Sequence, residues 1–275
     1  MAIITISREM GSGGIPIVHQ AAEELGYNLV DGETLKDVAA EYDLNDETLQ
    51  QVDEKPPAFV ENLDRQIELN MHRIQLIVLE SALKGNVIIY GRGGQDLLAG
   101  INSIFRVRII APFEERVERW AEREWIDPDL ARSLVRKSDQ QRAGFIKYYF
   151  DRDWEDPLEY DLVINTSKLS HETAVQMIVD GVKDRNLVEK KSAAKARLKD
   201  LVIQKKVQIA RLADERIQDI WFNIEVEKGT VTLTGHIYSE KERKAALEDA
   251  RKVEGVTQVI DHLRIVGYRN DPQEH

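Results

Sequence analysis

The sequence contains no cysteine. This absence excludes disulfide bonds, thiol catalysis and zinc sites built on cysteine, and it is typical of a reducing compartment. No apolar run approaches the roughly 20 residues that a membrane-spanning helix needs. The N-terminus shows no basic region followed by an apolar stretch. We therefore expect a cytoplasmic protein with no transmembrane segment.

Metal-ligand patterns and excess positive charge are also missing. The six histidines show no ligand spacing, so we expect no metal site built on them. The net charge is −11 and is uneven. Residues 190–275 carry 17 Lys and Arg against 14 Asp and Glu, whereas residues 1–189 carry 21 against 35. The acidic excess of residues 1–189 disfavours nucleic acid as a partner. An anionic ligand would need a local cluster of arginines.

The first 25 residues combine a strand pattern, a glycine-rich turn and a helix pattern. Residues 3–6 are apolar and β-branched like a buried strand, glycines follow at positions 11, 13 and 14, and a helix is expected over residues 16–25. Backbone N–H groups at a helix start point outward, and glycines let a phosphate approach them. The segment therefore predicts a phosphate-binding turn. The alternative is a turn that only joins strand to helix.

This turn lacks two parts of the usual P-loop, G-x-x-x-x-G-K-[ST], in which the lysine reaches the outer phosphates and the hydroxyl serves magnesium. Gly14 stands at the lysine position, Ile15 and Pro16 follow, and Arg8 replaces the first glycine. Arg8 can supply part of the missing charge but not the geometry of a lysine. Loss of one well-placed cation costs such a site on the order of a few kcal/mol. If this turn serves phosphoryl transfer, the sequence thus predicts that the transfer is slow or absent.

Strand and helix patterns alternate through residues 1–185. The strands are short and apolar on both faces, which is typical of a parallel sheet covered by helices. Ligands of such sheets bind beyond the carboxyl ends of the strands, where we expect Gly11, Asp31, Arg92 and Pro112. Further strands are expected at residues 27–30, 87–90, 105–111 and 161–165. Helices are expected at residues 33–40, 59–83, 114–124 and 170–181, after Asn45 or Asp46, and from Asp127 onward.

A second, smaller domain is expected over residues 207–270. Residues 186–206 are rich in Lys, Ala, Asp and Glu and predict a helical or partly flexible linker. A helix is expected at residues 207–217, followed by an alternating hairpin that turns at Lys228 and Gly229. Next come a helix at 239–253, with a capping box from Ser239 and Glu242, and a strand at 257–266. This order predicts an α+β fold.

Several motifs, in chain order, resemble the cytidylate kinase-like family of nucleoside monophosphate kinases. They lie at residues 6–14, 30–33, 53–57, 88–94, 105–112, 139–142 and 160–167. The segments at residues 229–235 and 253–259 resemble a BON domain. The first resemblance implies an α/β P-loop kinase fold over residues 1–185. It also implies transfer of the γ-phosphoryl group of ATP, bound with Mg²⁺, to CMP or dCMP, a reaction that depends on positioning and on neutralising charge.

The resemblance also implies roles for individual residues. Nucleotide-binding roles fall on Ser7, Gly11, Ser12, Gly13, Gly14, Asp31 and Arg92. Catalytic roles fall on Arg8, Arg136, Asp139 and Arg142, with the arginines neutralising the transferred phosphoryl group. A plain helix ion pair between Asp139 and Arg142 is the alternative for those two residues.

Two other functions fit the same sequence. In the first, the chain is a catalytically inactive nucleotide sensor, because Gly14 and Ile15 occupy the lysine and hydroxyl positions of a P-loop. Nucleotide binding would then change how the BON domain engages its partner. In the second, the BON domain is the functional part, and its resemblance implies a protein, a phospholipid surface or a small ligand as the partner.

Overall fold

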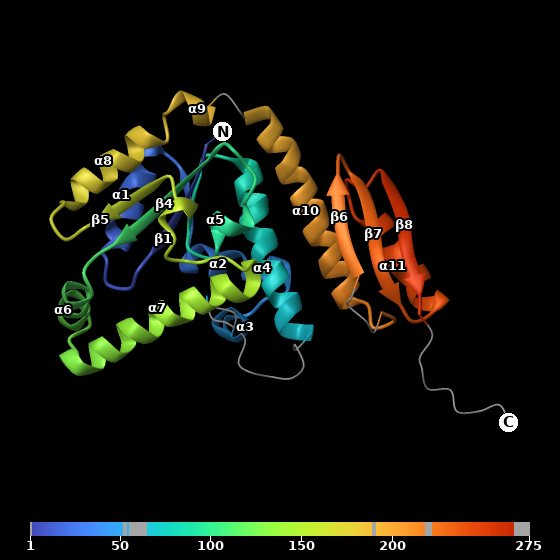
Figure 1. Cartoon of the computed structure of the whole chain (residues 1–275), viewed down its shortest axis with the longest axis horizontal. Coiled ribbons are helices and arrows are strands. Elements are labelled where there is room, and N and C mark those ends of the chain that lie inside the picture. The colour runs from blue at the N-terminus through green and yellow to red at the C-terminus, as the bar shows by residue number, and fades with distance from the viewer. Residues whose placement is uncertain (1, 52–53, 55–64, 189–190, 218–221, 267–275) are drawn as a thin grey trace.

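Five short strands form the parallel sheet that the sequence predicts (Figure 1). The computed structural model of the chain describes residues 2–51, 54, 65–188, 191–217 and 222–266. The strand order is β2-β3-β1-β4-β5, and every neighbouring pair is parallel. The strands are β1 (Ile3–Arg8), β2 (Asn28–Val30), β3 (Val87–Tyr90), β4 (Ile104–Ile110) and β5 (Leu162–Asn165). The predicted fold class is confirmed.

Helices cover both faces of this sheet, which is why its strands are apolar on both sides. Ile4 and Ile6 pack with α1 (Gly14–Leu25) and α8 (His171–Gly181) on one face. Ile3 and Ile89 pack on the other face with α4 (Arg65–Lys84) and with the end of α7 (Pro128–Phe150). The other α-helices packed around this sheet are α2 (Gly32–Val38), α3 (Asp46–Gln51), α5 (Gly94–Leu97), α6 (Phe113–Glu124) and α9 (Arg185–Val188), and short 3₁₀ helices span Ala39–Tyr42 and Pro157–Glu159.

The helix boundaries agree closely with the pattern of caps in the sequence. Asp127 accepts hydrogen bonds from the first N–H groups of α7, and Ser170 caps α8 in the same way. Asn45 accepts from the Thr48 N–H at 2.9 Å and so caps α3. The helix expected over residues 59–83 is seen as α4, and its first six predicted positions lie outside the described residues.

The C-terminal part is an α+β unit with its own core. Strands β6 (Phe222–Glu227) and β7 (Thr230–Ile237) are antiparallel, and β8 (Gln258–Ile265) lies parallel to β7. Lys228 and Gly229 both have positive φ, as the tight hairpin turn requires. Ser239 caps α11 (Glu240–Lys252). The second half of the predicted capping box is wrong, because the Glu242 carboxylate accepts from the Tyr238 N–H and not from that of Ser239.

One long helix belongs to both parts of the molecule. The helix expected at residues 207–217 is instead the end of α10 (Lys191–Ala213), which is continuous over 23 residues. Leu198 and Val202 pack into the core below the large sheet, whereas Ile203 and Val207 pack into the core of the small sheet. In Figure 1, α10 accordingly lies between the two sheets. Its two apolar faces explain why the pattern of one amphipathic helix did not identify it.

A lysine sits in the polar contact between α4 and α10. The Lys205 Nζ donates to Gln75 Oε1 at 2.7 Å and lies 3.0 Å from His72 Nδ1. Burial lowers the pKa of Lys205 to about 7; Glu68 opposes this shift and Arg211 adds to it. Burial also lowers the pKa of His72. The contact between the helices is therefore formed most favourably when these groups are neutral.

This contact predicts that stability rises with pH. In the unfolded chain Lys205 stays protonated to about pH 10.4, so between pH 7 and pH 10 the unfolded state binds one more proton than the folded state. The free energy of unfolding should then rise by up to about 1.4 kcal/mol per pH unit from this group. We expect Lys205→Met to flatten the rise, as measured by urea unfolding at pH 7, 8.5 and 10. The exposed Lys199→Met on the same helix is the control, and an equal slope in both variants would contradict the prediction.

No helix in the described part of the chain is both long enough and apolar enough to span a lipid bilayer.

Candidate functional site

The glycine turn after β1 forms a cradle of backbone N–H groups. Gly11 and Gly13 have φ of 80° and 79°, and Gly13 is the N-cap of α1. A Cβ at Gly11 would lie 2.5 Å from the Arg116 carbonyl oxygen, so only glycine fits there. The Gly11 and Gly13 N–H groups have no hydrogen-bond partner within the described residues, and the first N–H groups of α1 have none inside the helix. The turn is thus open to an anion.

Asp139 and Arg116 fix this turn in place. The Met10 N–H donates to Asp139 Oδ1 at 3.1 Å, and Arg116 donates to Asp139 Oδ2 at 2.6 Å and to the Met10 carbonyl at 3.0 Å. Arg116 is buried and also lies 3.2 Å from the Glu9 carboxylate. Burial raises the pKa of Glu9 although Arg116 and Arg108 are close. The structure therefore places Asp139 as a support of the turn and pairs it with Arg116, not with Arg142.

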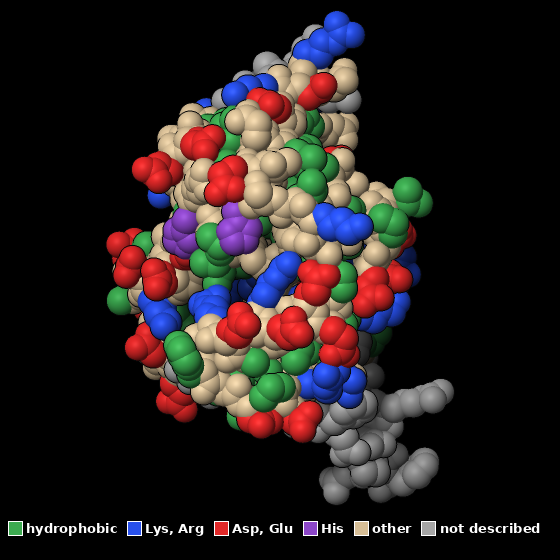
Figure 2. Space-filling view, turned by 90° about the vertical axis from the view of Figure 1, so that its left-hand side faces the viewer, with side chains coloured by type: hydrophobic (Ala, Val, Ile, Leu, Met, Phe, Trp, Pro, Cys, Tyr) green, Lys and Arg blue, Asp and Glu red, His purple; other side chains and the backbone are tan. Residues whose placement is uncertain are grey.

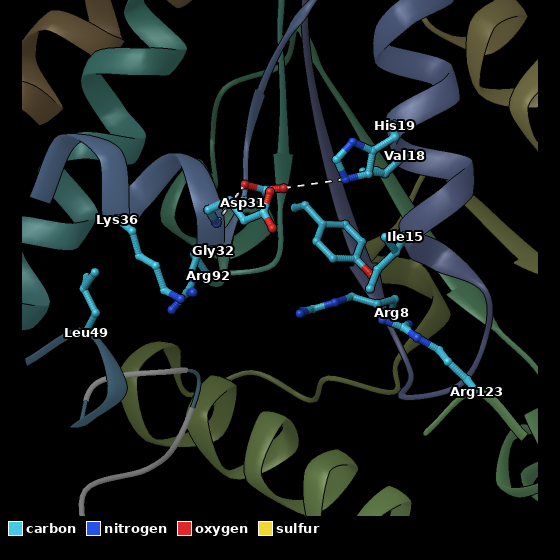
Figure 3. A pocket seen from close by; sticks show the side chains of 12 residues that line it. Arg8, Ile15, Val18, His19, Asp31, Gly32, Lys36, Leu49, Arg92 and Arg123 are labelled. Atoms are coloured by element: carbon cyan, nitrogen blue, oxygen red, sulfur yellow. Dashed lines mark hydrogen bonds and ion pairs between the residues drawn. The ribbon is translucent and has the colours of Figure 1, made fainter. Parts of the chain in front are cut away.

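A cavity of about 490 Å³ opens beside the turn (Figure 3). Arg8, Arg92 and Lys36 point into the same space, and Ile15 and Asp31 line it as well. The remaining lining residues include Val18, His19, Gly32, Leu49, Tyr90 and Arg123. The cavity thus lies at the carboxyl ends of β1, β2 and β3, where the sequence predicts a ligand.

Asp31 closes one side of the cavity and caps α2. Its Oδ1 accepts from the Glu33 and Thr34 N–H groups at 3.0 Å each, and its Oδ2 lies 3.8 Å from His19 Nε2. Burial acts to raise the pKa of Asp31, but the hydrogen bonds from Thr34 and Glu33 outweigh it and hold the pKa below its usual range. Asp31 is therefore an ionised group with one oxygen directed toward His19.

Arg8, Arg142 and the backbone of Arg92 converge on the carboxylate of Glu54, for which no role was predicted. Arg8 Nη1 donates to Glu54 Oε1 at 2.9 Å and to Oε2 at 2.7 Å, and it stacks 4.3 Å from the centre of the Tyr90 ring. Arg142 Nε donates to Glu54 Oε2 at 3.2 Å, and the Arg92 backbone N–H also donates to Glu54. Three of the four arginines predicted to meet an anion are thus brought together, and the fourth, Arg136, is not. Glu54 lies within the motif at residues 53–57. That motif is one of several that carry the family resemblance, and it was used for nothing else.

Of the other predicted residues, Ser7 lines a small cavity with Arg8, Glu54 and Arg142, whereas Ser12 and Arg136 lie apart from this cluster. Ser7 is buried, and its Oγ accepts from Trp154 Nε1 at 2.8 Å, so Ser7 contacts the core beneath the site. Ser12 is fully buried, and its Oγ donates to the Glu9 carbonyl at 2.8 Å within the turn. Arg136 is exposed, packs over the Phe113 ring and lines a separate cavity of about 300 Å³.

A further cavity, of about 460 Å³, adjoins the turn at His171 and Thr166. Thr166 Oγ1 donates to the Ser12 carbonyl at 2.8 Å, and Arg119 donates to Thr166 Oγ1 at 3.1 Å. The backbone of Gly13 approaches His171 so closely that a Cβ there would lie 3.1 Å from Nε2. No local sequence pattern indicates Thr166 or His171 as site residues, because their proximity to the turn depends on the folded sheet.

The charge on this side of the molecule matches the lining of these cavities. Figure 2 shows Lys and Arg side chains gathered in a hollow, with Asp and Glu side chains around it. A local basic site within an acidic protein is what an anionic ligand requires. No group of three His, Asp or Glu side chains in the described residues is placed to hold a metal ion. The Mg²⁺ implied by the resemblance therefore has no set of three such ligands within the described residues.

Comparisons with known proteins agree with this geometry. Residues 3–168 match the cytidylate kinase-like family, and residues 199–267 match the BON domain. A cytidylate kinase of Natronomonas pharaonis is 32% identical over 169 residues, which cover 61% of this chain and 82% of that protein. A cytidylate kinase of Ignicoccus hospitalis is 32% identical over 182 residues, covering 65% of this chain and 97% of that protein.

Among solved structures, an uncharacterized protein from Eubacterium ventriosum has the same fold with a TM-score of 0.54 and 24% identity. The match covers 67% of this chain and all of that one. The chain therefore belongs to the cytidylate kinase-like family and carries a BON domain after its kinase-like part.

Proposed function

We propose that this protein is a nucleoside monophosphate kinase that transfers the γ-phosphoryl group of ATP to CMP or dCMP. The observation that carries the proposal is the pair of cavities, of about 490 and 460 Å³, that adjoin a single glycine turn. Two nucleotides with their phosphates at one cradle satisfy the first requirement of phosphoryl transfer, which is positioning. Membership of the family supports this reaction class.

The two cavities have different linings, and we assign the phosphoryl donor, ATP, to one and the acceptor nucleotide to the other. The N–H groups of the turn at Gly11 and Gly13 would hold the ATP phosphates, with the rest of ATP in the cavity at His171. The acceptor would lie in the larger cavity, with its phosphate at Arg8 and Arg92 and its nucleoside near Asp31. Arginines fit this role because the guanidinium fork binds phosphate through two N–H groups at once.

A coupled assay of ADP release tests this proposal with ATP, Mg²⁺ and each of CMP, dCMP, UMP, AMP and GMP. We expect turnover with CMP or dCMP at a rate below that of a kinase with a complete P-loop. Absence of turnover with every acceptor, in a sample that binds ATP by calorimetry, would contradict it.

Ile15 favours a second candidate, a catalytically inactive nucleotide sensor. Ile15 supplies neither the cation nor the hydroxyl of a P-loop, and Glu54 neutralises part of the arginine charge. Helix α10 enters both cores, so a ligand-dependent shift of the kinase-like part would reach the BON domain. Binding of ATP and CMP without turnover, together with a ligand-dependent change in amide exchange over β6–β8, would favour this candidate.

A further inference from the structure

The Glu54 carboxylate occupies an anion site built from three separate segments. Arg8 stands at the end of β1, Arg142 on α7, and the Arg92 N–H in the glycine turn after β3. The Glu54 oxygens lie 2.7 and 2.9 Å from Arg8 Nη1, and Oε2 lies 3.2 Å from Arg142 Nε. The Glu54 side chain is only 10% exposed. A guanidinium, a second guanidinium and a backbone N–H on two oxygens are the donors by which proteins also bind phosphate.

This site holds more positive charge than one carboxylate balances. Burial acts to raise the pKa of Glu54, but Arg8, Arg142 and Arg92 outweigh it and hold the pKa far below its usual range. Burial and the neighbouring Arg8 lower the pKa of Arg142. Arg142 Nη1 is buried without a hydrogen-bond partner in the described part of the chain. An anion with more oxygens and a second charge would therefore satisfy this site better than Glu54 does.

The anion site opens onto the large cavity. Arg8 and Arg92 line both the Glu54 contact and the cavity that contains Asp31, and in Figure 3 both side chains reach into that space. A ligand that fills the cavity would thus bring its own anionic end to the arginines that Glu54 holds. Under the proposed function, the ligand of this cavity is the acceptor nucleoside monophosphate.

We propose that Glu54 is an internal competitor for the phosphate of the acceptor: its carboxylate holds the arginine site until a phosphate monoester replaces it. The inference rests on the proposed function for the identity of the acceptor. It makes occupancy of the site depend on the phosphate group itself, because a nucleoside without phosphate offers no anion to exchange with Glu54. It also keeps the arginines paired while the acceptor is absent.

Calorimetry on the full chain at pH 7.5, without ATP, tests the inference through the Glu54→Gln variant. We expect CMP to bind about tenfold more tightly to this variant than to the parent, because the competing charge is gone. Cytidine, the matched ligand without phosphate, should bind both proteins equally. The Glu54→Asp variant keeps the charge on a shorter side chain and should lie between them. Glu248→Gln, which removes a carboxylate from an arginine pair in the BON domain, should change nothing.

Equal or weaker CMP binding by the Glu54→Gln variant would overturn the inference, because Glu54 would then support the arginines and not compete for them. An equal gain for cytidine would overturn it too. If the Glu54→Gln variant does not fold, the Glu54→Asp variant decides by the same comparison. The assay reads binding alone, so tighter CMP binding without turnover in any protein would refute the kinase and leave the competitor role standing.

Discussion

We expect Ile15→Lys to raise the rate of phosphoryl transfer by about 10²-fold, since one well-placed donor or cation contributes that much in comparable sites. Ile15 directly follows the last glycine of the turn, is 39% exposed and lines the cavity beside Arg8. A lysine at this position would reach the phosphates held by the N–H groups of the turn. Its charge at the start of α1 opposes the helix dipole by only about 0.3–1 kcal/mol, which is smaller than the expected gain.

Position 15 is better suited to a lysine than position 14. A Cβ at Gly14 would lie 3.0 Å from the Tyr90 hydroxyl and 3.4 Å from Arg8, so a lysine there would displace the arginine it should assist. The control is Ile15→Met, which is similarly long and neutral and should leave the rate unchanged. The coupled assay with ATP and CMP measures both variants. If the lysine variant binds ATP and CMP but still shows no turnover, the nucleotide-sensor candidate gains and the kinase proposal fails.

The architecture was predictable because it is local and repetitive. Buried strands of the large sheet are apolar on both faces, and the first four are followed by turns with Gly, Asp or Pro, so the sequence indicates both the sheet and its binding edge. Helix α10 was not predictable in the same way. Leu198 and Ile203 face different cores, and a helix with two apolar faces shows neither a clear stripe nor a clear end.

In the candidate site too, features that are local in sequence were predictable and long-range contacts were not. The glycine turn is contiguous in sequence and so can be identified locally, whereas Glu54 acquires its contacts from residues 46 and 88 positions away. Nothing local to residues 53–57 shows that a carboxylate there meets Arg8 and Arg142. Similarly, the motif containing Asp139 and Arg142 placed both on one helix, but only the folded chain shows that Asp139 pairs with Arg116.

Arg65 is the residue through which α4 holds the end of α10. Its guanidinium donates to four backbone carbonyls, those of Arg211, Leu212, Asp214 and Ile217, at 2.7 to 3.1 Å. These carbonyls lie at and just beyond the C-terminus of α10, where helix carbonyls have no partner within the helix. Leu212 and Ile217 are buried, so water does not readily replace Arg65. A single side chain thus supplies hydrogen bonds to four backbone carbonyls at the junction between the two parts of the protein.

We expect Arg65→Ala to lower the free energy of unfolding by about 3 kcal/mol, since hydrogen bonds from a charged donor contribute about 1.5–3 kcal/mol each but are not additive. Urea unfolding followed by circular dichroism measures the loss. Arg65→Lys should recover part of it, because an ammonium has three donors on one atom and cannot span four carbonyls. Arg73→Ala is the matched control on the same helix, since Arg73 pairs with the exposed Asp43 and should cost less than about 1 kcal/mol. Equal losses for the two alanine variants would show that Arg65 does not hold the junction, and α10 would then be retained by its apolar contacts alone.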